Sequence, residues 1–258
     1  MTDRHPYLDG PHPRRYAHRG WHIGPLAGCE NTLAAFEHAV GEGFAYIEMD
    51  VHASADGVPM VHHDHSLDRT TDGAGPLAGL PAAQIEDARV AGREPVPRLE
   101  SVLSALPETR FTIELKSAEV VLPTLAVLER LDAWHRVCLG SFSETWLQRA
   151  RAGGGERLLT SMGMRSVLGL RSRAWLDALP VPGVLAEPLL PPVRGRLAQI
   201  PRRFGPLTVV DPALLRRAHG AGIEVHVWTV DDPAEMRELL DLGVDGLLSD
   251  RPDLLIAL

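Results

Sequence analysis

The chain has 258 residues, a normal length for a single α/β barrel, and its 45% of hydrophobic residues are enough for a large core. Its formal net charge is −8, and no cluster of Lys and Arg is long enough to follow a nucleic-acid backbone, which argues against nucleic acid as the main partner. The sequence has no apolar run of membrane-spanning length and no apolar leader, and Cys29 and Cys138 lack metal-site spacing, so we expect a reduced, cytoplasmic protein without a transmembrane segment.

Short apolar runs alternate with helical patterns along the whole chain. The predicted strands span residues 15–18, 46–51, 58–62, 110–115, 137–141, 158–161, 183–186, 207–210, 224–230 and 246–249. The predicted helices span residues 32–41, 99–105, 120–132, 144–152, 213–221 and 233–242. This alternation over about 250 residues predicts a parallel (β/α)8 TIM barrel that forms one domain, residues 1–258.

Ten predicted strands compete for the eight places in such a barrel. An Asp-Gly turn signal at residues 56–57 predicts that the strand at 58–62 folds back as a hairpin on the strand at 46–51. A second surplus strand lies between residues 183 and 210, and the sequence does not resolve it. Residues 64–98 are rich in Gly, Pro, Ala and Asp and break the alternation, which predicts an insertion on the catalytic rim of the barrel.

Two carboxylates interrupt the apolar strand at 46–51. Because residues two apart on a strand point to the same face, Glu48 and Asp50 project side by side. Two such carboxylates repel each other, and burying an unpaired charge is unfavourable. A hard divalent cation with oxygen ligands would relieve the repulsion, and pairing with Lys or Arg is the alternative that this segment leaves open.

Polar motifs stand at the carboxyl ends of four predicted strands, which form the active-site face of a TIM barrel. They are His18-Arg19-Gly20, Glu48-Met49-Asp50, His63-Asp64 and Glu114-Leu115-Lys116. We therefore expect their side chains to meet at one site.

The charges of these motifs suit a phosphodiester. With a divalent cation on Glu48, Asp50 and Glu114, the two cations Arg19 and Lys116 bring the set to one net positive charge, which a single phosphodiester anion neutralises. We therefore predict that the three acids are metal ligands. We predict that the two cations contact the phosphate.

Histidines complete the predicted chemistry. Because histidine titrates near neutral pH, His18 and His63 can serve as base for the attacking hydroxyl and acid for the leaving alcohol. The chain has 12 histidines, so a structural role for either one is the alternative. Periodicity does not choose among His62, His63 and His65. Trp228 lies either in the pocket wall or in the core.

The motifs together resemble the glycerophosphodiester phosphodiesterase family from Tyr16 to about Pro252. The segments that carry the resemblance are His18-Arg19-Gly20 with Glu30-Asn31-Thr32, Glu48-Met49-Asp50-Val51, the block from Asp56 to Thr71 that contains His63-Asp64, Val96-Pro97-Arg98-Leu99, Ile113 to Lys116, Trp228-Thr229-Val230, and Ser249-Asp250. The resemblance implies a (β/α)8 barrel, a divalent cation (Mg²⁺ or Ca²⁺), and hydrolysis of small-molecule glycerophosphodiesters to glycerol 3-phosphate and an alcohol.

The resemblance also assigns roles by position. It implies metal binding by Glu48, Asp50 and Glu114, acid–base catalysis by His18 and His63, and phosphate contact by Arg19 and Lys116. A histidine directly before aspartate selects His63 among its neighbours, and the insertion at 64–98 matches a small domain that family members place over the site. The sequence departs from the common pattern at Cys29, Asp231 and Ser249, none of which is a predicted catalytic residue.

Other functions remain as alternatives. A lysophospholipase D-like enzyme would share the site but needs an apolar groove for an acyl chain, and the sequence, with 5% aromatic residues, does not reveal one. An enolase-type barrel needs a capping domain for which this chain is short. A barrel that binds phosphodiesters without turnover is disfavoured by the complete set of predicted catalytic residues.

The sequence leaves four properties open: the alcohol head group, the choice between Mg²⁺ and Ca²⁺, the histidine that starts as base and the oligomeric state.

Overall fold

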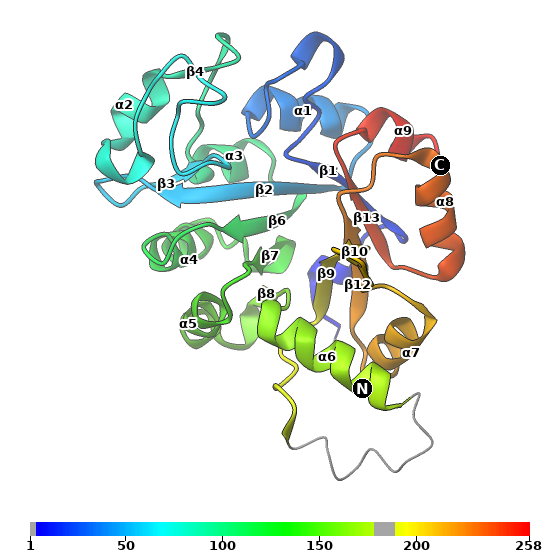
Figure 1. Ribbon diagram of the computed structural model, residues 1–258. Coiled ribbons are helices and arrows are strands. Elements are labelled where there is room, and N and C mark those ends of the chain that lie inside the picture. The colour runs from blue at the N-terminus through cyan, green and yellow to red at the C-terminus, as the bar shows by residue number, and fades with distance from the viewer. Residues whose placement is uncertain (1–3, 178–188) are drawn as a thin grey trace.

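Parallel strands close into a barrel with helices on its outside (Figure 1). The computed structural model describes residues 4–177 and 189–258. In these residues the barrel contains eight parallel strands: β1 (Arg14–His18), β2 (Tyr46–Ala53), β6 (Arg110–Leu115), β7 (Val137–Gly140), β8 (Leu159–Thr160), β9 (Leu197–Pro201), β12 (Glu224–Trp228) and β13 (Gly246–Ser249). A parallel bridge between Ser161 and Leu197 joins the first and last strands of the sheet order β8-β7-β6-β2-β1-β13-β12-β9. The predicted TIM barrel is confirmed.

A helix follows each barrel strand before the next one begins. In chain order these helices are α1 (Leu33–Gly41), α3 (Leu99–Ala105), α4 (Val121–Arg130), α5 (Glu144–Gly154), α6 (Met164–Leu176), α7 (Pro212–Gly220), α8 (Pro233–Leu242) and α9 (Pro252–Ile256). Side-chain caps fix where several begin: Thr32 accepts a hydrogen bond from the Ala35 amide at the start of α1, and Asp211 accepts one from the Leu214 amide at the start of α7. The main hydrophobic core lies between the sheet and these helices.

The end of the barrel at the amino termini of the strands is closed by the residues before β1. Tyr7, in the 3₁₀ turn η1 (Pro6–Asp9), is fully buried, and its hydroxyl is 3.1 Å from the Tyr16 hydroxyl and 2.8 Å from Thr112 Oγ1. Beside it, the buried Arg14 donates to both carboxylate oxygens of Glu224, at 2.6 and 2.8 Å. This plug leaves the opposite end of the barrel as the open mouth.

The second barrel strand continues into a hairpin, as predicted. The strand β3 (Pro59–Val61) pairs antiparallel with the end of β2. Residues 64–98 then form a separate lobe, with the 3₁₀ turn η3 (Leu77–Gly79), the helix α2 (Ala82–Asp87) and the two-stranded ribbon β4 (Arg89–Val90) and β5 (Glu94–Pro95). Figure 1 shows α2 and β4 beyond the end of β2, at one side of the barrel. Part of this segment, together with Met60, has its own hydrophobic cluster.

The predictions for residues 162–211 were the least accurate. The predicted strand at 183–186 lies outside the described residues. The predicted strand at 207–210 is present as the shorter β11 (Leu207–Thr208), which pairs antiparallel with β10 (Arg203–Phe204) in a hairpin after β9 and is therefore surplus to the barrel. The sequence analysis missed β9 itself, since Gln199 interrupts its apolar run, and it missed α6, whose apolar stripe is interrupted by arginines. No helix in the described part of the chain is both long and apolar enough to cross a membrane.

Candidate active site

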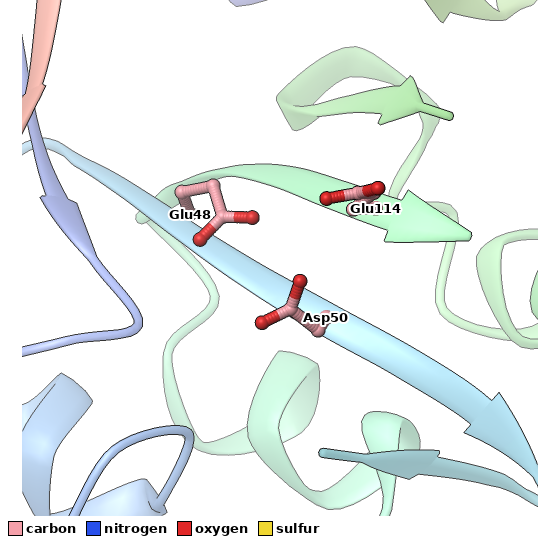
Figure 2. A group of neighbouring side chains, drawn as sticks. All are labelled: Glu48, Asp50 and Glu114. Atoms are coloured by element: carbon pink, nitrogen blue, oxygen red, sulfur yellow. The ribbon is translucent and has the colours of Figure 1, made fainter. Parts of the chain in front are cut away.

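The acidic residues predicted as metal ligands meet at the mouth of the barrel. Glu48 and Asp50 lie on β2 and Glu114 lies on the neighbouring strand β6, where the register pairs it with Asp50 (Figure 2). One oxygen from each carboxylate lies within 4.8 Å of the others, and Glu48 and Asp50 are buried. Alternation along two parallel strands therefore places three carboxylates on one wall.

Two cations pair with these three acids and do not neutralise them. Lys116 Nζ lies 2.8 Å from Glu114 Oε2 and 2.9 Å from Asp50 Oδ1, and Arg19 Nε lies 3.4 Å from Asp50 Oδ2. Burial acts to raise the pKa of Asp50, but Lys116 and Arg19 outweigh it and hold that pKa below its usual value. Burial and the neighbouring Asp50 raise the pKa of Glu48 to about 8, and burial also raises the pKa of Glu114.

The donor set fits a divalent cation. All three groups offer carboxylate oxygens, which Mg²⁺ and Ca²⁺ prefer. Asp50 Oδ1 is buried and pairs with the Lys116 ammonium at 2.9 Å. Burial and the charge of Asp50 raise the pKa of Glu48, and a bound cation would oppose both effects.

The loop after β1 is shaped to bring Arg19 and Asn31 against Asp50. Both residues adopt left-handed backbone conformations, with φ of 57° and 58°. Asn31 Nδ2 donates to Asp50 Oδ2 at 2.8 Å, and the Asp50 amide donates to Asn31 Oδ1 at 3.3 Å. Gly20 has a φ of +85°, and a Cβ there would lie 2.8 Å from the Phe36 ring, so the turn requires glycine.

His18 stands beside this cluster at the end of β1. Its Nε2 is 3.6 Å from Glu48 Oε2, and its Nδ1 is 2.6 Å from Oδ1 of Asp250, the residue that directly follows β13. Burial acts to lower the pKa of His18, but the charges of Glu48 and Asp250 outweigh it and raise that pKa.

His63 lies two residues after β3, the strand that pairs with the end of β2. Its Nδ1 is 2.6 Å from Asp64 Oδ1, and Arg69 donates to Asp64 Oδ2 at 2.6 Å. Hydrogen bonds from Arg69 and His63 hold the pKa of Asp64 below its usual value. The charge of His63 also lowers the pKa values of two of the acids, Asp50 and Glu114, which indicates that its ring is close to the cluster.

The neighbouring histidines are not placed for the same role. His62 is buried, and its Nε2 is 3.1 Å from the Ser66 carbonyl oxygen, whereas His65 is exposed. Of the three, His63 is therefore the one whose surroundings suit acid–base chemistry.

Trp228 lies across the mouth, at the end of β12. It is half-buried against the cluster that fills the barrel interior, and the Phe142 ring, which follows β7, meets it edge-on with the centroids 5.8 Å apart. Phe142 is 53% exposed, and its carbonyl oxygen accepts from the amide of Met164, which is 60% exposed. This side of the mouth is thus apolar and aromatic.

Most of the predicted site residues come together by direct contact, namely His18, Arg19, Glu48, Asp50, Glu114 and Lys116. Trp228 ends β12, which does not pair with β2 or β6, the strands that carry the acids. No site role was predicted for Asp250, Asn31 or Phe142. Asp250 and Phe142 each directly follow a predicted strand at the end that carries the other motifs, and Asn31 and Asp250 lie in segments of the family resemblance.

Comparisons with known proteins agree with this geometry. Residues 17–254 match the family model described as "Glycerophosphoryl diester phosphodiesterase family". The "Probable glycerophosphodiester phosphodiesterase 2" of Mycobacterium tuberculosis is 38% identical over 93% of this chain and 88% of its own. A crystal structure of the glycerophosphodiester phosphodiesterase from Agrobacterium tumefaciens is 28% identical, with a TM-score of 0.72 over 95% of this chain and 99% of its own. An Oleispira antarctica phosphodiesterase, solved with the product sn-glycerol-3-phosphate, is 24% identical with a TM-score of 0.76 over 98% of each chain.

Proposed function

The chain belongs to the glycerophosphoryl diester phosphodiesterase family, and on that premise we propose that it hydrolyses glycerophosphodiesters to glycerol 3-phosphate and an alcohol. The observation that carries this proposal is the acidic cluster of Glu48, Asp50 and Glu114, with His18 Nε2 3.6 Å from Glu48 and His63 just after β3, the strand that pairs with β2. A site with acids for a cation and a histidine for each proton transfer suits the cleavage of a phosphodiester.

We propose that Glu48, Asp50 and Glu114 hold Mg²⁺ or Ca²⁺. The bound cation would act as a Lewis acid toward a phosphoryl oxygen. With the cation bound, Asp50 and Glu114 would no longer pair with Lys116. Lys116, which directly follows β6, would then contact the phosphate. Arg19 would add a second cationic contact, and together they stabilise the charge that develops on the phosphoryl oxygens.

The two histidines would handle the protons. One accepts the proton of the attacking hydroxyl, whose oxygen forms a bond to phosphorus, and the other donates a proton to the alcohol oxygen as its bond to phosphorus breaks. The attacking group is either water or a glycerol hydroxyl, and in the second case water opens the resulting cyclic phosphate. Either route consumes one water. Carboxylates bound to the Nδ1 atoms of His18 and His63 leave the Nε2 atoms for these transfers.

Residues 64–98 would form a small insertion at the side of the site, within a single domain. Arg69 from this segment donates to Glu30 at 2.7 Å, and Arg93 donates to the carbonyl oxygens of Pro25 and Ala27 at 2.6 and 2.7 Å. These bonds tie the segment to the loop between β1 and α1. Because this segment begins directly after His63, we expect it to restrict access to that histidine.

The apolar side of the mouth favours a second candidate substrate class, the lyso-lipids. Phe142 and Met164 are exposed, and Phe142 packs edge-on against Trp228. An acyl chain needs such a surface, and the sequence alone did not reveal it. In this alternative the same charged groups would cleave a monoacyl glycerophosphodiester, so only the substrate would differ.

Assays with purified protein test both candidates. Glycerophosphocholine and lysophosphatidylcholine would be incubated separately with Mg²⁺ or Ca²⁺, with and without EDTA, and the glycerol 3-phosphate or its acylated form measured. Release that EDTA abolishes, and that the His18→Ala variant lacks, is the expected result. Absence of release from either substrate with either metal would refute the proposed function.

A further inference from the structure

The carboxylate of Asp250 lies between two histidines. Its Oδ1 is 2.6 Å from Nδ1 of His18 and 3.2 Å from Nε2 of His22. His18 ends β1 and Asp250 directly follows β13, and these strands are parallel neighbours in the sheet. The two hydrogen bonds hold the pKa of Asp250 below its usual value, although burial acts to raise it, so the group is a carboxylate at neutral pH.

A second aspartate fixes the backbone that carries Asp250. Oδ1 of Asp231, in the loop after β12, accepts hydrogen bonds from the Asp250 amide at 2.8 Å and from the Ser249 hydroxyl at 2.9 Å. Ser249 is fully buried, and its own Oγ accepts from the Arg251 amide at 2.9 Å. The turn after β13 therefore has little freedom to move Asp250 away from His18.

We propose that Asp250 is the positioning residue for His18, and that Asp231 holds Asp250 in place. A neutral imidazole carries one proton, and a carboxylate at Nδ1 fixes that proton there. The lone pair of Nε2 is then directed toward the reaction centre, where Nε2 already lies 3.6 Å from Glu48 Oε2. This inference rests on the proposed acid–base role of His18, which it extends by naming what sets the tautomer and orientation of the ring.

His22 contributes to the same arrangement from the loop between β1 and α1. His22 donates a second hydrogen bond to Oδ1 of Asp250 and so restrains the rotation of this side chain, which is 41% exposed. The carboxylate that contacts Nδ1 of His63 is that of Asp64, and Arg69, not a histidine, donates the hydrogen bonds that hold it. Each proposed catalytic histidine thus has a carboxylate that is itself restrained.

Steady-state kinetics of variants test the proposal. We expect Asp250→Ala to lower kcat about 10- to 100-fold, the usual range for loss of a group that orients an imidazole, with KM for glycerophosphocholine changed less than threefold. Asp231→Asn keeps the acceptor oxygen and should retain at least fivefold more activity than Asp231→Ala. Asp253→Asn, on the exposed face of α9 where Asp253 pairs with Arg251, is the matched control and should stay within twofold of wild type.

Nitrogen NMR of histidine-labelled protein gives a readout that a purely structural role would not change. At alkaline pH, His18, identified by its loss in His18→Gln, should carry its proton on Nδ1 in the wild type and shift toward the Nε2-protonated form in Asp250→Ala. An unchanged tautomer, or a loss in kcat below threefold, would overturn the proposal. If the wild type hydrolyses no phosphodiester, the proposed function fails, and the tautomer measurement still tests the role of Asp250.

Discussion

Glu48 is a buried acid of the candidate site whose pKa is strongly raised. Its pKa is raised from the ordinary 4.5 to about 8 by burial and by Asp50, so the metal-free fold favours its protonated form. A carboxyl with a raised pKa binds its proton more tightly in the folded state than in the unfolded state. The contribution of Glu48 to the free energy of unfolding of the metal-free protein therefore falls as pH rises from about 4.5 toward 8.

A bound divalent cation should reverse this trend. We expect Mg²⁺ or Ca²⁺ to raise the melting temperature by several degrees more at pH 8 than at pH 5, because at pH 5 protons compete for the same oxygens. Glu48→Gln should stabilise the metal-free protein at pH 8 and remove most of the metal-induced shift. Thermal unfolding in EDTA and in excess metal measures both effects. Equal metal-induced shifts at the two pH values would contradict the assignment.

A variant of His63 tests its proposed role in proton transfer. His63→Ala should lower kcat about 10²- to 10⁴-fold, because one of the two proton transfers loses its group. His65→Ala, two residues away and exposed, is the matched control and should stay within twofold of wild type. Initial rates of glycerol 3-phosphate release compare the two. A loss below tenfold for His63→Ala would mean that this ring transfers no proton.

Individual site residues were predictable where a strand carried them. Strand periodicity and strand ends placed Glu48, Asp50, Glu114 and His18 correctly, because alternation decides which side chains face the mouth. The contacts of Asn31 and Asp250 run between loops that are distant in sequence, and they depend on backbone conformations such as the left-handed turn at Asn31. No local pattern predicts such contacts.

At the scale of elements, the N-terminal plug is the part of the fold with the clearest energetic role. Tyr7→Ala would empty a fully buried ring site, and we expect it to lower the free energy of unfolding by about 3–5 kcal/mol. Tyr7→Phe keeps the ring but removes the hydroxyl that meets Tyr16 and Thr112, so a loss of about 1–2 kcal/mol is expected. Urea unfolding measures both values.

The catalytic rate provides the control for the plug. Since the Tyr7 hydroxyl bonds to Tyr16 and Thr112 and to none of the three acids, Tyr7→Phe should leave kcat within twofold of wild type. A loss in kcat greater than twofold would show that the plug influences the active site.

Element prediction succeeded where strands and helices had regular patterns and was least accurate between residues 162 and 211. The strand at 110–115 and the helix at 233–242 were predicted with their observed bounds. The strand β9 has only three clearly apolar residues before Pro201, and the hairpin after it has residues with strand preference that pair outside the barrel. Periodicity describes a segment's own preference, and here tertiary pairing decided which short strand entered the barrel.

At the scale of the whole molecule, the barrel mouth divides into two halves. The strands β13, β1, β2 and β6 are consecutive in the sheet, and they or the turns after them carry the acids, the cations and His18. Of the other four strands, β7, β8 and β12 are followed or ended by Phe142, Met164 and Trp228, whereas β9 is followed by Arg202. A substrate with a charged phosphate and an apolar chain would match both halves at once.

This division predicts how substrate preference depends on Phe142. Because the ring is 53% exposed, Phe142→Ala should change the free energy of unfolding by less than about 1 kcal/mol. If the apolar half holds an acyl chain, the variant loses one aromatic contact worth about 0.5–1.5 kcal/mol, and kcat/KM for lysophosphatidylcholine should fall roughly 3- to 10-fold.

The matched substrate is glycerophosphocholine, which has the same head group and no acyl chain, and its kcat/KM should change less than twofold in Phe142→Ala. Leu122→Ala is the matched variant, since Leu122 is 47% exposed on the outer helix α4 and should affect neither substrate. Equal losses on both substrates would place Phe142 beside the reacting phosphate. No loss on either would show that acyl chains do not bind on this half of the mouth, and the lyso-lipid alternative would then lose the observation that favours it.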